Sequence, residues 1–226
     1  SGETEGGVPL CQVTRPHHTG TVEDFALEWY RSRGWDGVHS ENGPFLTLFM
    51  VLFWDIVFHS NERICASHRD CPVVLRFPSV ASTEHWTRAR ERLTTITTGG
   101  TAATSEILSR HYTAYEGRQA FGVNWGVLGG LAGLDQLARG LGSDAVARIC
   151  WCYLDDLEAY LGGVPDLYIW RRSPAANSSA EGVSNRIEIK LVEVKGPRDK
   201  LSDRQLSWLR VLKAAAVNVE VFRVQG

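Results

Sequence analysis

The hydrophobic pattern of the chain changes at Gly162. Upstream of it, apolar residues recur mostly at helical spacing, and downstream they gather in short runs that are typical of strands. The first part predicts helices over residues 21–33, 45–58, 82–93, 103–115, 126–141 and 144–161. The second part predicts strands over residues 167–170, 187–194 and 217–224, a helix over 202–215, and a polar hairpin loop over 173–184.

These elements predict an α/β fold in which an N-terminal helical part accompanies a mixed sheet with flanking helices. Residues 1–20 begin with small, polar and glycine residues, so we expect them to form a flexible or truncated end. Residues 21–161 are the expected helical part, and residues 162–226 are the expected core that carries the sheet.

Composition narrows the class of protein without deciding it. Of the 226 residues 43% are hydrophobic, which is enough for a substantial core. The longest apolar run, residues 45–58, is shorter than the roughly 20 residues that a membrane span needs, so we expect a buried helix and no membrane partner. The five cysteines show no zinc-type spacing, and we expect reduced thiols.

Charge is distributed unevenly along the chain. The formal net charge is -2, but from Tyr160 onward eleven Lys and Arg stand against seven Asp and Glu, a balance of +4 that leaves -6 for the rest. A surface for nucleic acid, if there is one, therefore belongs to the last third of the chain.

The strand over residues 187–194 breaks its own binary pattern. Side chains of one parity, Ile187, Ile189 and Leu191, form an apolar face, and Glu193 and Lys195 continue that face. Charges on the covered side of a sheet are costly unless they pair with each other, a metal or a substrate. A structural ion pair is the simplest interpretation, and a functional site is the other.

Asp166 favours the functional interpretation. The preceding Gly162-Gly163-Val164-Pro165 forms a tight turn that places Asp166 at the start of the neighbouring strand. If the two strands pair as a hairpin, the carboxylates of Asp166 and Glu193 converge, and clustered carboxylate oxygens suit Mg²⁺ or Mn²⁺. Glu41 is a further candidate, because it is expected in a turn or in the first turn of the apolar helix.

Several segments together resemble a known nuclease family. They are GGVPDLYIW (162–170), KLVEVKGPRDKLSDRQLSWL (190–209), VEVFRV (219–224) and GWDGVHSENGPFLTLFMVLFWDIVF (34–58). This set resembles the VRR-NUC branch of the PD-(D/E)xK superfamily, a restriction-endonuclease-like fold, and within it the catalytic region of the Fanconi-associated nucleases. The resemblance makes residues 162–226 the catalytic core, to which the helical part contributes Glu41.

The resemblance also implies roles for individual residues. Asp166, Glu193, the Val194 carbonyl and Glu41 would hold Mg²⁺ or Mn²⁺, and Lys195 would position the attacking water or neutralise charge on the phosphate. Gln205 matches a glutamine of the family site, but it also completes a Ser202-x-x-Gln205 capping box, so both roles remain open. Three basic side chains follow the Glu-x-Lys strand and would contact DNA phosphates: Arg198, Lys200 and Arg204.

The expected function is a metal-dependent, structure-specific DNA endonuclease and 5′-exonuclease that acts on branched or 5′-flap DNA. Through the resemblance this implies DNA repair, in particular of interstrand crosslinks, and a nuclear location in a eukaryote or a cytoplasmic one otherwise. A stand-alone VRR-NUC Holliday-junction resolvase is the alternative enzyme. From other classes, a catalytically silent DNA-binding module and a non-nucleic-acid binding protein with a structural ion pair also remain.

Overall fold

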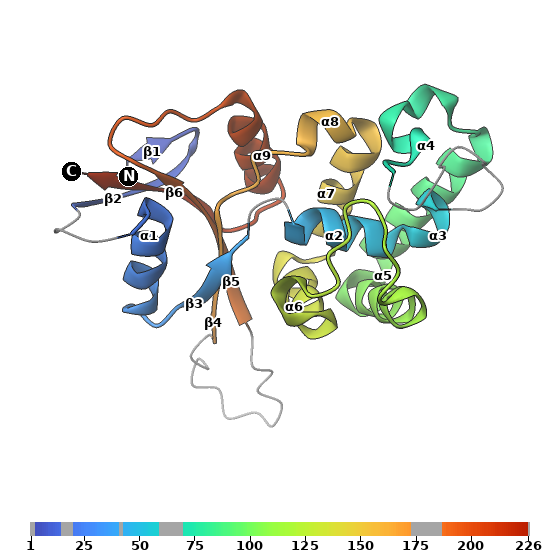
Figure 1. The fold of residues 1–226 in the computed structure, drawn as a ribbon, viewed down its shortest axis with the longest axis horizontal. Coiled ribbons are helices and arrows are strands. Elements are labelled where there is room, and N and C mark those ends of the chain that lie inside the picture. The colour runs from blue at the N-terminus through green and yellow to red at the C-terminus, as the bar shows by residue number, and fades with distance from the viewer. Residues whose placement is uncertain (1–2, 15–19, 41–42, 59–69, 173–186, 226) are drawn as a thin grey trace. The chain divides into compact units, whose positions relative to one another are not determined.

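The structure is a computed structural model that describes residues 3–14, 20–40, 43–58, 70–172 and 187–225. The chain divides into two compact units (Figure 1). The sheet unit combines Ser1–Glu41 with Val164–Gly226, and the helical unit is Asn42–Gly163.

The sheet unit contains a six-stranded mixed sheet in the order β1-β2-β6-β5-β4-β3. Its strands are β1 (Thr4–Glu5), β2 (Val8–Thr14), β3 (Asp36–His39), β4 (Leu167–Arg172), β5 (Ile187–Lys195) and β6 (Val219–Gln225). Strands β3, β4 and β5 pair antiparallel, as does β1 with β2, whereas β6 lies parallel to both β5 and β2. The parallel pair arises because a helix carries the chain back between β5 and β6. The predicted α/β class with a mixed sheet is confirmed.

Two helices cover the faces of this sheet (Figure 1). Helix α1 (Val22–Arg31) begins with a capping box between Thr21 and Asp24, and its apolar side packs on the face that bears Val192 and Val194. Helix α9 (Asp203–Ala214) is the connection between β5 and β6, and its Trp208 is fully buried. Because side chains alternate along β5, Glu193 and Lys195 point away from the α1 face.

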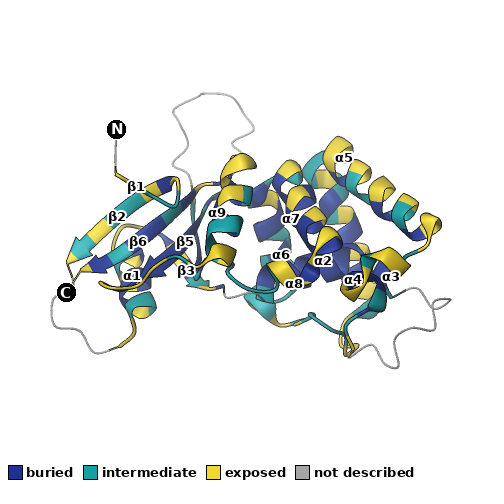
Figure 2. Cartoon of the chain, turned by 90° about the horizontal axis from the view of Figure 1, so that it is seen from above, coloured by how far each residue is buried: buried dark blue, intermediate teal, exposed yellow. Residues whose placement is uncertain are grey.

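The helical unit is built around helices α2 and α5. It contains α2 (Gly43–Leu52), α3 (Trp54–Val57), α4 (Val73–Arg76), α5 (Thr83–Tyr115), α6 (Leu131–Leu141), α7 (Ser143–Asp155), α8 (Leu157–Tyr160) and the short 3-10 helices η1 (Pro78–Val80) and η2 (Val127–Gly129). Nearly every residue of α2 is buried, whereas the outer face of α5 is exposed (Figure 2). In the part of the chain that the structure describes, no helix is both long enough and apolar enough to cross a membrane.

The structure differs from the sequence-based expectations in its details. The predicted helix 45–58 is interrupted at Phe53, and the predicted helices 82–93 and 103–115 belong to one helix that kinks at Gly100, where φ is +67°. The end expected to be flexible, residues 1–20, contains β1 and β2. The predicted hairpin loop, residues 173–184, lies outside the described residues.

The division into units also differs from the expected one. Helix α1 and strand β3 belong to the sheet unit, although we expected residues 21–161 to form one helical part. Both elements are held by the sheet: α1 buries Phe25, Ala26 and Leu27 against it, and β3 pairs with β4. Long-range packing of this kind is not visible in local sequence periodicity.

Candidate active site

Asp166 stands at the start of β4, where three segments of the sheet unit meet. The pairing of β3 with β4 continues past His39, because the Ser40 N–H donates to the Asp166 carbonyl at 2.8 Å and the Ser40 hydroxyl donates to the Pro165 carbonyl at 2.6 Å. The Asp166 carboxylate oxygen Oδ2 accepts a hydrogen bond from the Val194 N–H at 2.7 Å. The backbone of Asp166 is therefore held by the segment after β3, and its carboxylate is held by β5.

Glu193 and Lys195 share one face of β5, as the strand pattern predicted. Both are buried, with exposed fractions of 0% and 8%, and Lys195 Nζ lies 2.8 Å from Glu193 Oε1. The same oxygen accepts a hydrogen bond from Gln205 Nε2 on α9 at 2.5 Å. The other oxygen, Glu193 Oε2, has no hydrogen-bond partner among the described residues. One carboxylate oxygen is thus fully engaged, and the other is buried without a donor.

The two carboxyl groups perturb each other. Burial and the nearby Asp166 raise the pKa of Glu193 to about 8, against the opposing effect of Lys195. Burial also raises the pKa of Asp166, although the Val194 N–H and the charge of Lys195 oppose this. Protein groups alone therefore do not compensate both negative charges, and a bound cation would.

Gln205 completes the predicted capping box and also contacts the predicted site. Its Oε1 accepts a hydrogen bond from the Ser202 N–H at 2.9 Å, which completes the capping box at the start of α9. Its Nε2 donates to Glu193. The backbone donor thus fixes which end of the amide faces the carboxylate.

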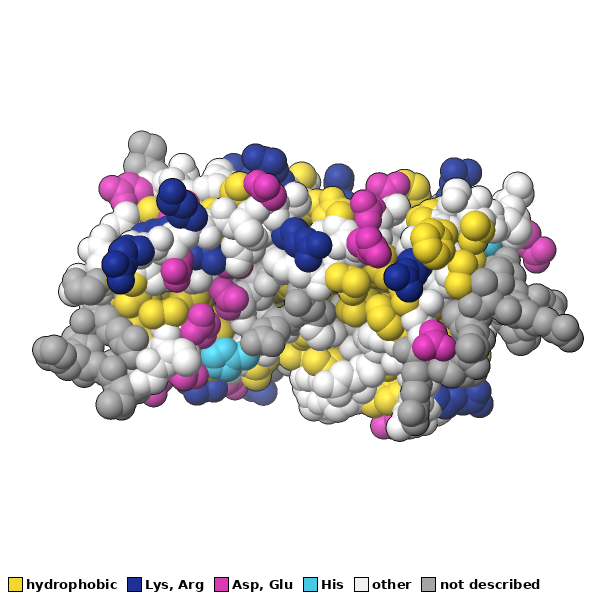
Figure 3. Space-filling model, turned by 45° about the horizontal axis from the view of Figure 1, so that its top comes forward, with side chains coloured by type: hydrophobic (Ala, Val, Ile, Leu, Met, Phe, Trp, Pro, Cys, Tyr) yellow, Lys and Arg dark blue, Asp and Glu magenta, His cyan; other side chains and the backbone are white. Residues whose placement is uncertain are grey.

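The three basic residues predicted to contact phosphate lie close to this site in the chain. Arg198, Lys200 and Arg204 are all exposed, and none has a hydrogen-bond or ion-pair partner within the described ranges. They stand in the loop after β5 and in the first turn of α9. The face drawn in Figure 3 shows Lys and Arg side chains interspersed with Asp and Glu. This face therefore has no uniformly basic surface, and binding of phosphate would depend on individual side chains such as these three.

Glu41, the predicted fourth member of the site, lies outside the described residues. Its neighbour in sequence, Ser40, is hydrogen-bonded to Asp166 and Pro165. A residue that sequence reasoning missed is Glu23 in the first turn of α1, whose charge contributes to raising the pKa of Asp166. The acidic first turn of α1 was visible in the sequence, but the approach of that turn to Asp166 depends on the fold.

The donor set suits a hard divalent cation. Asp166 and Glu193 supply carboxylate oxygens, one of them buried without a donor, and such oxygens are what Mg²⁺ and Mn²⁺ prefer. Within the described residues, no group of three or more His, Cys, Asp and Glu side chains is arranged to hold a metal. The Val194 carbonyl, a main-chain oxygen, stands between Glu193 and Lys195 in the sequence.

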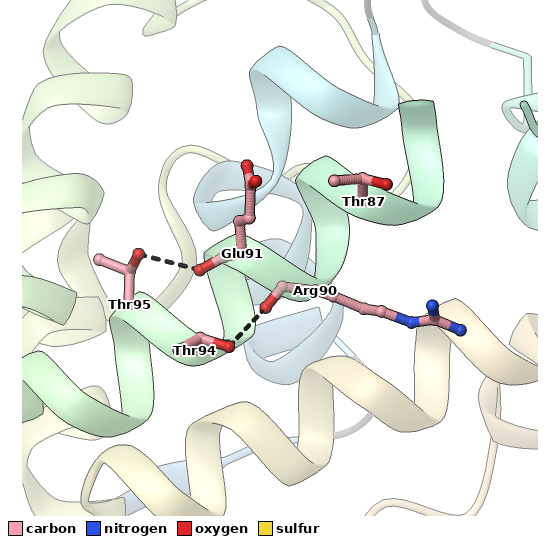
Figure 4. A pocket seen from close by; sticks show the side chains of 5 residues that line it. All are labelled: Thr87, Arg90, Glu91, Thr94 and Thr95. Carbon is pink, nitrogen blue, oxygen red and sulfur yellow. Dashed lines mark hydrogen bonds between the residues drawn. The ribbon is translucent and has the colours of Figure 1, made fainter. Parts of the chain in front are cut away.

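The helical unit has a shallow hollow whose lining is mostly threonine side chains. It is lined by residues of α5 alone: Thr87, Arg90, Glu91, Thr94 and Thr95. The threonine hydroxyls Thr94 Oγ1 and Thr95 Oγ1 donate to the carbonyls of Arg90 and Glu91 in their own helix (Figure 4). Because these hydroxyls are already hydrogen-bonded, the hollow is a groove between side chains of a helix surface.

Comparison with known proteins identifies the family of this chain. The model of the VRR-NUC domain matches residues 101–226, more than half of the chain. The chain belongs to the VRR-NUC domain family. The predicted resemblance is therefore confirmed, and the matched VRR-NUC region contains Asp166, Glu193, Lys195 and Gln205.

Curated relatives extend the likeness beyond the matched region. Fanconi-associated nuclease 1 of Danio rerio is 31% identical over 228 residues, which cover 99% of this chain and 21% of that protein. The Mus musculus protein is 33% identical over 208 residues, 90% of this chain and 19% of that protein. The chain thus spans about a fifth of the length of these curated relatives.

A solved structure supports the fold. The crystal structure of paFAN1 bound to 1nt 5′flap DNA with gap matches with a TM-score of 0.74 and 23% identity, covering 97% of this chain and 38% of that chain. This likeness shows that the two chains share a fold, which agrees with the predicted mixed sheet and flanking helices.

Proposed function

We propose that this chain is the catalytic part of a divalent-metal-dependent DNA nuclease that hydrolyses phosphodiester bonds. The observation that carries the proposal is the buried Glu193 carboxylate, with one oxygen held by Lys195 and Gln205 and the other without a donor beside Asp166. An oxygen of a fully buried carboxylate that has no donor costs stability unless another group, such as a bound cation, compensates it. Membership in the VRR-NUC family supports the same chemistry.

Asp166, Glu193 and the Val194 carbonyl would hold Mg²⁺ or Mn²⁺, with Glu41 as a further carboxylate. Ser40, which immediately precedes Glu41, is hydrogen-bonded to Asp166 and so supports this assignment. When bound, such an ion polarises the scissile phosphate and lowers the pKa of a bound water.

The other side chains act around these carboxylates. Lys195, which is buried and paired with Glu193, carries the positive charge that neutralises a phosphate in the transition state or orients the attacking water. Gln205 holds Glu193 in place from α9. Arg198, Lys200 and Arg204, exposed and next in sequence to the site, contact the DNA backbone.

The substrate that we propose is branched or 5′-flap DNA, cut endonucleolytically or from the 5′ end. The likeness to Fanconi-associated nuclease 1 and to paFAN1 bound to flap DNA supports this choice. DNA repair, interstrand crosslink repair in particular, is the corresponding process, with a nuclear location in a eukaryotic cell. A Holliday-junction resolvase is the alternative enzyme, and a catalytically silent DNA-binding module is the alternative from another class.

The test is to incubate the purified chain with labelled 5′-flap, four-way-junction and single-stranded DNA in Mn²⁺ and in Mg²⁺. We expect cleavage of the flap substrate that stops in EDTA and falls at least about a thousandfold in Asp166→Ala. Preferred cutting of the junction favours the resolvase. Binding of DNA without cleavage favours the silent module, and cleavage that persists in Asp166→Ala contradicts the proposed site.

A further inference from the structure

The loop that follows the Glu-x-Lys strand is braced from two sides. Within the loop, Asp199 Oδ2 accepts a hydrogen bond from the Gly196 N–H at 2.8 Å. A Cβ on Gly196 would lie 2.8 Å from that oxygen, so glycine allows this close approach. From outside, Arg223 Nη1 donates to the Gly196 carbonyl at 2.8 Å and to the Asp199 carbonyl at 3.1 Å.

Arg223 stands beside the catalytic strand and is itself oriented by the N-terminal strand. In the sheet, Arg223 of β6 is the partner of Lys195 of β5. Its Nε donates to Glu5 Oε2 at 3.0 Å, its Nη2 also pairs with Glu5, and the two side chains are 17% and 24% exposed. A guanidinium that is held by a carboxylate on one edge presents its remaining N–H groups in a fixed plane.

The turn between β1 and β2 contacts the same region a second time. A Cβ on Gly6, whose φ is +59°, would lie 2.8 Å from a methyl group of Leu201 and near Leu206 and Leu209. Lys213 of α9 also donates a hydrogen bond to the Gly7 carbonyl. The β1–β2 hairpin therefore supports both ends of the segment that carries Arg198, Lys200 and Arg204.

We propose that Glu5 is a positioning residue for DNA binding: through Arg223 it fixes the loop of residues 196–200, so that Arg198 and Lys200 meet the phosphate backbone of the DNA. This inference rests on the proposed function, because it needs DNA as the ligand. Neither Glu5 nor Arg223 touches the DNA. Their contribution is to hold the two exposed cations of the loop in place, which reduces the conformational entropy lost on binding.

The experiment compares Glu5→Gln with Glu3→Gln, a matched change in the segment before β1, where the side chain accepts a hydrogen bond from Gln12 and from no other residue that the structure describes. Binding of a fluorescent 5′-flap DNA is measured without divalent ions from low to moderate salt, and cleavage is measured in Mn²⁺. For Glu5→Gln we expect roughly fivefold weaker binding, a smaller dependence of log K on log salt, and a loss of cleavage that falls on KM and not on kcat. Arg223→Lys should bind DNA as weakly as Glu5→Gln does, because an ammonium group cannot replace the planar set of N–H donors of the guanidinium. Glu3→Gln should bind as the wild type does.

A double-mutant cycle separates positioning from general stability. If Glu5 acts through the loop, Glu5→Gln should have no further effect on DNA binding once Arg198→Gln and Lys200→Gln are present. The same fivefold loss in that background, or binding by Glu5→Gln equal to the wild type, overturns the inference and leaves the proposed function standing. A wild-type chain that neither binds nor cuts DNA overturns both.

Discussion

Each of the two units contains a carboxylate at least partly buried: the Asp55 side chain is 33% exposed, and Glu193 is fully buried. In the helical unit, Asp55 accepts hydrogen bonds from Arg92 Nη2 at 3.0 and 2.9 Å, and Arg88 and His111 lie at 3.5 and 3.6 Å. In the sheet unit, Glu193 has Lys195 and Gln205 on one oxygen and no described donor on the other.

The pKa values of the two groups move in opposite directions. Burial acts to raise the pKa of Asp55, but the hydrogen bonds and charge of Arg92 outweigh it and lower the pKa overall. Burial and Asp166 raise the pKa of Glu193 to about 8. The difference separates a structural charge from a functional one: Asp55 is matched by the permanent charges of Arg92 and Arg88, whereas Glu193 lacks one positive charge that a bound cation would supply.

The largest expected effect is on Glu193. A carboxyl whose folded pKa is raised stabilises the fold below its ordinary value of 4.5 and loses that contribution as pH rises towards about 8. Without divalent ions, Glu193→Gln should therefore equal the wild type near pH 4 and be more stable at pH 8 by up to about 5 kcal/mol, since one pKa unit corresponds to about 1.4 kcal/mol. Denaturant unfolding across this pH range measures the difference.

Addition of Mn²⁺ tests whether a cation supplies the charge that Glu193 lacks. A cation that binds only the folded chain should stabilise the wild type at pH 8 and should stabilise Glu193→Gln much less. Cleavage should be lost in the variant in spite of its greater stability. Equal stability of the two proteins over the whole pH range would contradict the conclusion that the negative charge of Glu193 destabilises the fold when no cation is bound.

These sites differ in how far the sequence predicts them. Asp166, Glu193 and Lys195 were predictable because a strand has a period of two, so two charges on an apolar face stand out, and a proline turn fixes the start of the next strand. The ion pair of Asp55 with Arg92 was not predicted, because 37 residues separate its members and the sequence does not show which cation meets the single charge of the apolar run 45–58.

The helices and strands also differ in how far the sequence predicts them. The longer helices and the strands β4, β5 and β6 show strong local patterns, and the sequence located them, although it divided α5 into two helices and did not predict α4. Strands β1, β2 and β3 were missed because they are short or mixed in character and depend on pairing with distant strands, as β2 does with β6. The links from Glu5 to Arg223 and from Glu23 to Asp166 depend on those pairings and were invisible for the same reason.

A second prediction tests the matched carboxylate. Arg92→Met removes the main partner of Asp55 and also a hydrogen bond to the Leu52 carbonyl, so it should destabilise the chain by about 3 kcal/mol at pH 7. Adding Asp55→Asn should recover part of this loss, because the unpaired charge is then absent. Urea unfolding of the two variants and the wild type measures the loss, and a loss below about 1 kcal/mol for Arg92→Met would show that the charge of Arg88 suffices for Asp55.

The smallest expected effect concerns the donor that Glu193 does have. Ser202→Ala and Gln205→Ala each remove half of the capping box of α9, so each should cost about 1 kcal/mol of stability. Only Gln205→Ala also removes the amide that holds Glu193 Oε1, so only this variant should lower kcat, by roughly tenfold, with little change in DNA affinity. Thermal unfolding and single-turnover cleavage of both variants separate the two effects. Equal loss of cleavage in both would mean that Gln205 serves the site only by starting the helix, and that Lys195 alone holds the buried carboxylate.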